Sequence, residues 1–182
     1  LEGTRSEHGF SVDMGLAHIN WPEIPLAERC DTLAVPLGRD DVPSPVATNI
    51  GNPHATFFVE DAETIALAEI GPGLEHHPMF PERANIGFAS LTAPDTLRLR
   101  VWERGVGITM ACGSGACAVG VAVARRGLGG DTNRIVMDGG AVTIYWDRET
   151  THVTMTGPVA YVYEGSLSAG LAGLLEAGDV RP

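Results

Sequence analysis

Residues 112–127 have the sequence CGSGACAVGVAVARRG, the most distinctive helical pattern in the chain. This pattern indicates a helix that is apolar on every face until Arg125 and Arg126. A helix without a polar face must be surrounded by other elements, and its small residues allow strands to approach the helix axis closely. The two arginines complement the negative end of the helix dipole, and Gly127 is a typical stop. We therefore predict a buried helix over 113–126.

Short strand-like segments dominate the rest of the chain. They are apolar or alternating, and Gly, Pro, Asp or Asn bounds them. Over 97–103, three aliphatic residues alternate with two arginines and a tryptophan, the period of a half-buried strand. The other predicted strands are 10–14, 33–37, 46–50, 54–59, 86–91, 134–137, 141–146, 152–156 and 159–163. Residues 138–140 (DGG) predict a hairpin with a three-residue loop.

Two further helices are predicted between these strands. One covers 62–70, with Asp61 as its cap and Gly71 as its stop, and the other covers 168–177 near the end of the chain. The sequence thus predicts an α+β fold in which a strand-rich sheet wraps around a central buried helix.

Composition excludes several classes of function. The chain has 182 residues, of which 44% are hydrophobic, as expected for a packed globular protein. It carries 12 basic and 23 acidic residues, a formal net charge of −11, so neither nucleic acid nor an acidic membrane is an expected partner. Every basic residue is an arginine. Without lysine, this chain cannot form a pyridoxal phosphate Schiff base or supply a phosphate-loop lysine.

The cysteines bear on cellular location. Cys30, Cys112 and Cys117 are an odd set without a CxxC pair, which favours a reducing compartment over a disulfide framework. The first residues lack the pattern of a secretory signal, and the apolar run over 116–124 is far shorter than the roughly 20 residues of a membrane span. We expect a cytoplasmic protein.

Cys112 is the main candidate for chemistry. It directly precedes the helix, where the N–H groups of Gly113 and Ser114 have no partner within the helix and the dipole is positive. Such a terminus binds a carboxylate or phosphate and lowers the pKa of a cysteine thiol from about 8.5 to between roughly 3.5 and 7.5. The alternative is a small residue needed only for packing, which is the role we assign to Cys117.

Two charged residues end the predicted strand that leads to Cys112. Glu103 could accept hydrogen bonds from a substrate ammonium or tune the thiol, and Arg104 could clamp a carboxylate through two hydrogen bonds. The alternative is an ion pair at the end of a strand.

Other polar residues lie in turns that enter strands. Asn52 and His54 belong to one such turn and Asn85 to another, and for all three simple turn chemistry is the alternative to a binding role. Glu75, His76 and His77 suggest metal ligands, but an adjacent histidine pair in a loop has no established ligand spacing. We predict no metal site.

Four stretches, in this order, resemble the diaminopimelate epimerase family of the cofactor-independent amino-acid racemases. They are VDMG from Val12, GNPHATFFVED from Gly51, EHHPMFPERANIGF from Glu75 and WERGVGITMACGSGACA from Trp102. The last stretch is the most specific, and together they cover most of the chain up to about Gly165.

The resemblance implies an isomerase that interconverts LL-2,6-diaminopimelate and its meso form, in lysine and peptidoglycan precursor biosynthesis, without any cofactor. One cysteine removes the α-proton and a second returns a proton from the opposite face. The residue roles that it implies are Cys112 as one base; Gly113 and Ser114 as holders of the α-carboxylate; Glu103 at the reacting end, where it also sets the protonation of the thiol; Asn52, Asn85 and Arg104 at the distal carboxylate and ammonium; and His54 as a modulator of the other cysteine.

The resemblance also implies a division of the protein into two similar domains that face each other in a pseudo-symmetric fold. Residues 1–165 resemble the C-terminal domain, and 166–182 look like an extension. The second cysteine of the family lies in a glycine motif of the N-terminal domain, and Cys30 lacks those glycines. We therefore expect the missing N-terminal domain to be a required partner, and a homodimer stays an open alternative.

Three other functions stay open from the sequence. The first is a related racemase that acts on another amino acid. The second is a module that binds an amino acid without turning it over, for which Cys112→Ser would leave affinity nearly unchanged. The third is a cysteine acyl-transfer enzyme with His54 as its base.

Overall fold

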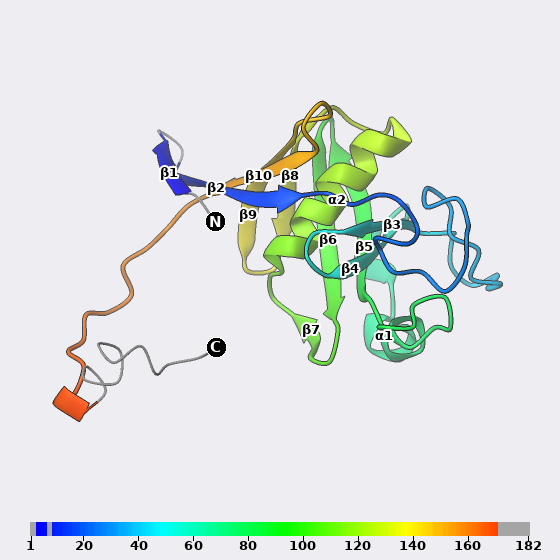
Figure 1. Ribbon diagram of the computed structural model, residues 1–182, viewed down its shortest axis with the longest axis horizontal. Coiled ribbons are helices and arrows are strands. Elements are labelled where there is room, and N and C mark those ends of the chain that lie inside the picture. The colour runs from blue at the N-terminus through cyan, green and yellow to red at the C-terminus, as the bar shows by residue number, and fades with distance from the viewer. Residues whose placement is uncertain (1–2, 7–8, 171–182) are drawn as a thin grey trace.

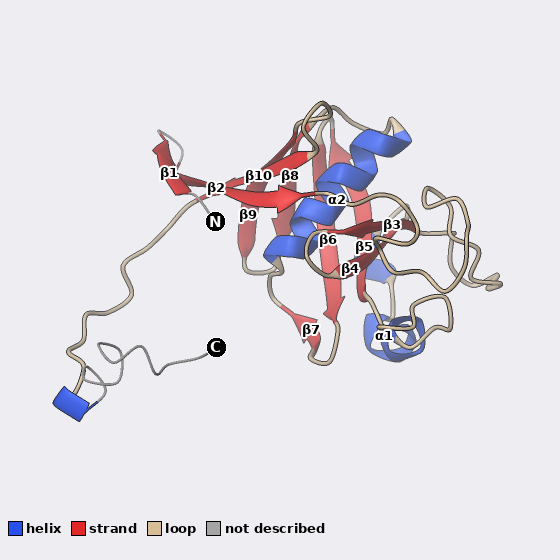
Figure 2. Ribbon diagram, viewed as in Figure 1, coloured by secondary structure: helices blue, strands red, loops and turns tan. Residues whose placement is uncertain are grey.

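The computed structural model describes residues 3–6 and 9–170, which form a mixed ten-stranded sheet and two α-helices (Figures 1 and 2). The α+β class is therefore confirmed. The elements are β1 (Gly3–Ser6), β2 (Gly9–Leu16), β3 (Val46–Asn49), β4 (Pro53–Phe58), the 3₁₀ turn η1 (Ala62–Thr64), α1 (Leu67–Glu75), β5 (Asn85–Ala93), β6 (Thr96–Glu103), β7 (Gly107–Thr109), α2 (Gly113–Arg126), β8 (Thr132–Met137), β9 (Gly140–Trp146) and β10 (His152–Gly157).

The sheet has the strand order β1-β2-β10-β9-β8-β6-β5-β4-β3, and β7 pairs with β6. The β4–β5 and β6–β8 pairs are parallel, and the other pairs are antiparallel. Along β6 the aliphatic residues Leu97, Leu99 and Val101 are buried and their neighbours are partly exposed. The predicted alternation of this strand is confirmed.

Helix α2 has the predicted span. It begins after Cys112 and ends at Gly127, whose φ of 66° is the left-handed conformation that glycine adopts readily. Every residue from Gly115 to Ala124 is buried, and α2 contacts seven strands of the sheet, β3 to β6 and β8 to β10. A Cβ atom at Gly120 would lie 2.5 Å from the Ile144 side chain of β9. The small residues of this helix therefore allow the close approach expected from the sequence.

The helix predicted over 62–70 is wrong at both ends. Asp61 does act as a cap, because its carboxylate accepts the Glu63 N–H, but it caps only η1. Helix α1 begins later, at Leu67, and continues through Gly71 to Glu75. Gly71 does not stop the helix because the Trp102 ring lies against it, with ring atoms 2.7 Å from where a Cβ would be.

Two predicted strands and one loop length are wrong. Residues 33–37 form no strand: Val35 is buried and donates its N–H to the Pro45 carbonyl, but the next residue is a proline without a donor. Residues 159–163 are exposed and lead away from the sheet (Figure 1). The hairpin loop has two residues, because Met137 pairs with Gly140. The helix predicted over 168–177 lies largely outside the described residues.

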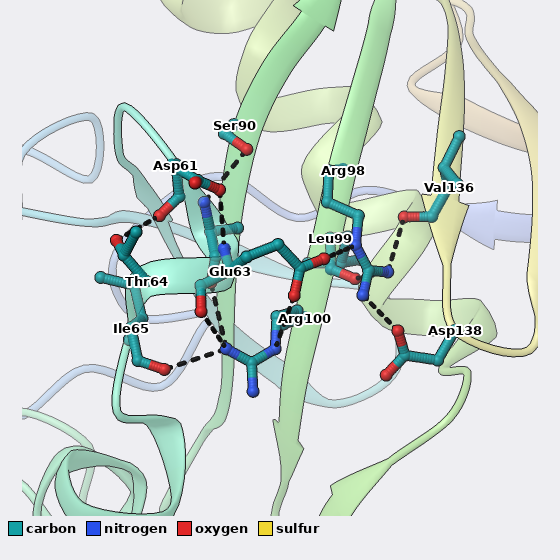
Figure 3. Close-up of polar contacts among 11 residues, drawn as sticks. Asp61, Glu63, Thr64, Ile65, Ser90, Arg98, Leu99, Arg100, Val136 and Asp138 are labelled. Atoms are coloured by element: carbon teal, nitrogen blue, oxygen red, sulfur yellow. Dashed lines mark hydrogen bonds and ion pairs between the residues drawn. The ribbon is translucent and has the colours of Figure 1, made fainter.

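An ion-pair network on β6 connects η1 to the β8–β9 hairpin (Figure 3). The Arg98 guanidinium donates to Glu63 and Asp138 and also to the Leu99 and Val136 carbonyls. Arg100 donates to three carbonyls of residues 62–65. The hairpin residue Gly139 donates its N–H to the Met110 carbonyl at 2.6 Å. This chain of contacts therefore extends to the loop that leads into Cys112.

Candidate active site

Cys112 occupies the N-cap position of α2 with an extended backbone (φ −142°, ψ 109°) and makes no side-chain capping hydrogen bond. Its side chain is buried, and Sγ lies 3.7 Å from the Ser114 hydroxyl. A Cβ atom at Gly115 would lie 3.2 Å from Sγ, so a side chain there would crowd the thiol. Among the described residues no side chain accepts the N–H groups of Gly113 and Ser114, so these two groups are open to an anion beside the thiol.

The pKa of the Cys112 thiol is shifted in the direction opposite to that expected from the sequence. Burial raises the pKa of the Cys112 thiol and the Glu103 carboxylate raises it further, while hydrogen bonds from Ser114 and Gly115 lower it by less. The prediction of a lowered pKa is therefore wrong, because loss of hydration outweighs the helix terminus. The fully buried Cys117 has its pKa raised to about 12, mainly by burial, as befits a packing residue.

Glu103 is held at the end of β6 by the small strand β7. The Thr109 hydroxyl donates to its carboxylate, and the backbone of Glu103 pairs with Gly107. The sequence does not indicate Thr109 as a site residue, because a strand of three residues is too short to show a periodic pattern in the sequence. The carboxylate acts on the pKa of Cys112, so these two predicted site residues are neighbours.

The parallel pairing of β4 and β5 places His54 opposite Asn85. The Asn85 carboxamide accepts the Arg104 N–H at 2.9 Å and donates to the Pro53 carbonyl at 3.1 Å. Nε2 of His54 donates to the Asn52 carboxamide oxygen at 2.9 Å. Burial, and then the nearby Arg104 charge, lower the pKa of His54 to about 3, so the ring is neutral. Four predicted site residues thus gather in one cluster.

The Arg104 side chain is oriented by a carbonyl group. Its Nη1 donates to the Glu82 carbonyl at 2.9 Å. Within residues 3–6 and 9–170, no carboxylate forms an ion pair with Arg104. Its charge is therefore available for an acidic ligand. Glu103 belongs with Cys112, and Arg104 belongs to the Asn52–His54–Asn85–Arg104 cluster. Because Glu103 and Arg104 are consecutive, the two groups adjoin.

The other candidates have structural partners. His76 and His77 donate to the Pro72 and Leu37 carbonyls, and the His77 ring also accepts the Met79 N–H. Among the described residues there is no group of three or more side chains that could hold a metal ion. Cys30 packs against the core cluster that includes α1 residues. No helix in the described part of the chain is long and apolar enough to cross a membrane.

Comparisons with known proteins agree on one family. The family model described as diaminopimelate epimerase matches residues 46–162. The chain is 56% identical to the diaminopimelate epimerase of Acidiphilium cryptum over 160 residues, which are 88% of this chain and 57% of the relative. It is 53% identical to the diaminopimelate epimerase of Rhodospirillum centenum over 167 residues, 92% of this chain and 57% of the relative.

A solved structure, described as a predicted epimerase from Pseudomonas aeruginosa, shares the fold with a TM-score of 0.57 and 17% identity. The alignment covers 91% of this chain and 61% of that one. The chain thus spans about 57% of the length of the two curated relatives named above.

Proposed function

The chain belongs to the diaminopimelate epimerase family, and on that premise we propose that it forms the Cys112-bearing half of a cytoplasmic epimerase. Its reaction is the interconversion of LL-2,6-diaminopimelate and meso-diaminopimelate without pyridoxal phosphate, a step towards lysine and peptidoglycan precursors. In this proposal residues 1–165 are the C-terminal domain, with the sheet wrapped around α2 as a central helix, and 166–182 are an extension. The opposing, pseudo-symmetric domain supplies the second base.

The observation that carries the proposal is the buried Cys112 thiol at the uncapped start of α2, next to Glu103. In one direction the Cys112 thiolate takes the α-proton and becomes a thiol. The electron pair of the broken C–H bond moves into the α-carboxylate, and the N–H groups of Gly113 and Ser114 stabilise the added charge. The second base, in its acid form, then donates a proton to the opposite face of the carbon.

In the reverse direction Cys112 is the proton donor. Its raised pKa suits this role, because the free site then holds a thiol at neutral pH. Glu103 faces the ammonium of the reacting end. Binding of that cation would offset the repulsion between the Glu103 carboxylate and the thiolate, and so favour the thiolate only when substrate is present.

The Asn52–His54–Asn85–Arg104 cluster recognises the distal end of the substrate. Arg104 binds the distal carboxylate, and the carboxamides of Asn52 and Asn85 fix its orientation together with the distal ammonium. The neutral His54 ring belongs to this cluster and lies near the cysteine of the opposing domain. The acyl-transfer alternative loses support here, because a ring with a pKa of about 3 that already donates to Asn52 is a poor general base.

A hybrid protein tests the proposal with the missing half supplied. In it, this chain replaces the matching segment of the Acidiphilium cryptum relative, and the unaltered relative is the control. Chiral chromatography follows LL-diaminopimelate as it approaches equilibrium with the meso form. We expect a folded hybrid to epimerise diaminopimelate and to leave glutamate and proline unchanged. A folded hybrid that binds diaminopimelate without converting it would support the binding-module alternative and overturn the proposal.

A further inference from the structure

Glu75 is a buried carboxylate for which the proposed mechanism has no use. It is the last residue of α1, and only 3% of its surface is exposed. One carboxylate oxygen accepts the Trp102 indole N–H at 2.7 Å, and the other accepts the Gly105 backbone N–H at 2.9 Å. The second oxygen also lies 3.5 Å from Nη1 of Arg83. A buried carboxylate is costly unless its oxygens are satisfied in this way.

The partners of Glu75 flank residues of the proposed site. Trp102 and Gly105 stand immediately before Glu103 and immediately after Arg104. On the other segment, the Glu75 carbonyl accepts the Ala84 N–H, next to Asn85. Asn85 in turn accepts the Arg104 N–H. Glu75 therefore holds the two backbone segments that carry Asn85 and Arg104.

The indole of Trp102 fits a slot that leaves its N–H facing Glu75. Two glycines lie against the ring: a Cβ atom would come within 2.7 Å of it at Gly71 and within 3.6 Å at Gly107. Gly71 and Glu75 are four residues apart on α1 and so share a helix face. This face positions the ring by close contact and orients it by a hydrogen bond.

The carboxylate form is favoured at this position. Burial raises the pKa of Glu75, but the hydrogen bonds from Trp102 and Gly105, the His76 charge and Arg83 together hold it below its usual value. A charged acceptor with two donors sets the position of the chain more strictly than an apolar side chain of similar size.

We propose that Glu75 is a positioning residue that presents Glu103 and Arg104 to the substrate by fixing the backbone of residues 102–105. The inference rests on the proposed epimerase function. Glu75 touches no substrate in this account. Its effect passes through the geometry of its neighbours, where a displacement of about 1 Å can cost about 100-fold in rate.

The test compares Glu75→Gln with Glu69→Gln in the hybrid. Glutamine has one acceptor oxygen, so either Trp102 or Gly105 faces an NH₂ group and loses its partner. Glu69 is an exposed residue on the same helix and forms no side-chain hydrogen bond within the described residues, which makes it the matched control. We expect Glu75→Gln to lower kcat/KM for diaminopimelate about 10-fold to 100-fold, in part through a higher KM, and Glu69→Gln to leave both kcat and KM unchanged.

A second readout is independent of activity. The ¹H–¹⁵N spectrum of this chain reports the Trp102 indole N–H, with Trp21 and Trp146 as internal references, and we expect its proton resonance to move upfield in Glu75→Gln. If the resonance moves while KM stays unchanged, the positioning role is overturned and the epimerase function stands. If the hybrid with Glu75 intact is folded but inactive, the proposed function fails instead.

A purely structural role would behave differently from a positioning role. It would reduce the amount of folded protein and hence apparent kcat, with KM unchanged, and that result would also overturn the inference. If Glu75→Gln does not fold, Trp102→Phe makes the same test, because it deletes one donor and leaves the carboxylate bound to Gly105. We expect Trp102→Phe to raise KM by a smaller factor than the carboxylate change, and an unchanged KM would contradict the inference.

Discussion

Nε2 of the His54 ring lies 2.9 Å from the Asn52 carboxamide oxygen, and the ring is buried. With an oxygen as its partner, this nitrogen carries the proton. The pKa of His54 is lowered to about 3, chiefly by burial and further by the Arg104 charge. The imidazole is therefore a neutral hydrogen-bond donor at neutral pH, which makes the site sensitive to acid.

The first prediction concerns stability in acid. Because the pKa of His54 is lower in the folded state (about 3) than in the unfolded state (6.5), the unfolded state binds this proton first as the pH falls. The contribution of His54 to stability is complete above pH 6.5 and is lost towards pH 3. Between pH 7 and pH 4.5 the wild type should lose about 2–3 kcal/mol more free energy of unfolding than His54→Gln. Urea titrations at both pH values measure the difference, and equal losses would contradict the burial of a neutral ring.

The second prediction concerns the Cys112 thiol. In a Cys30→Ala background, the pH profile of iodoacetamide alkylation should have its midpoint above the usual thiol value of about 8.5, because burial raises the pKa. Glu103→Gln should move the midpoint to lower pH by removing a negative charge. Ser114→Ala should move it to higher pH by removing a hydrogen bond to the thiolate. A midpoint below 8.5 would show that the helix terminus outweighs burial, and shifts of the opposite sign would contradict the effects assigned to Glu103 and Ser114.

The third prediction separates diaminopimelate from substrates with a single carboxylate. In the hybrid, Arg104→Ala should lower kcat/KM for diaminopimelate about 10-fold to 100-fold, the worth of a charge-assisted hydrogen bond. Exchange of the α-proton of lysine, which has no distal carboxylate, should change far less. Equal losses for the two substrates would remove the support for diaminopimelate and favour a related racemase.

The fourth prediction concerns the packing of α2 and uses two helical glycines. Gly120→Ala would place a Cβ atom 2.5 Å from Ile144 and should cost about 1–3 kcal/mol of unfolding free energy by overpacking. Gly73 on α1 has only an ordinary contact, 3.5 Å from the Arg39 guanidinium. Gly73→Ala should therefore be neutral or stabilise by up to about 1 kcal/mol. Thermal unfolding of both variants makes the comparison, and similar melting temperatures would contradict the close packing of α2 on β9.

The sequence predicts much of the fold because several patterns are local. The all-apolar run with terminal arginines and Gly127 specifies α2, and the alternation over 97–103 specifies β6. The failures come from tertiary contacts that no local pattern contains. Gly71 would end an isolated helix, but the Trp102 ring, thirty-one residues further along the chain, packs against it. In the apolar segment 33–37, Val35 and Leu37 are buried in alternation, as in a strand, yet no neighbouring strand pairs with the segment among the described residues.

The sequence indicates the candidate site residues one by one, but it does not indicate their arrangement. The motifs around Asn52, Asn85 and Cys112 mark these residues as candidates for binding or catalysis. The parallel β4–β5 register that places His54 opposite Asn85 is known only from the structure of the sheet. The raised pKa of Cys112 also depends on burial, which a helix-start motif does not reveal. The sequence indicates Glu75 only as a possible metal ligand, because the groups that donate hydrogen bonds to its carboxylate, Trp102 and Gly105, lie on another segment.

The proposed epimerase reaction depends on transfer of the α-hydrogen by Cys112. The hybrid is incubated with LL-diaminopimelate in D₂O under reducing conditions, and mass spectrometry and chiral chromatography follow deuterium uptake and inversion. We predict uptake accompanied by inversion, a loss of about 1,000-fold or more in inversion for Cys112→Ala, and no change for Cys30→Ala. Inversion by folded Cys112→Ala at the rate of the unaltered hybrid would show that Cys112 is not a catalytic base.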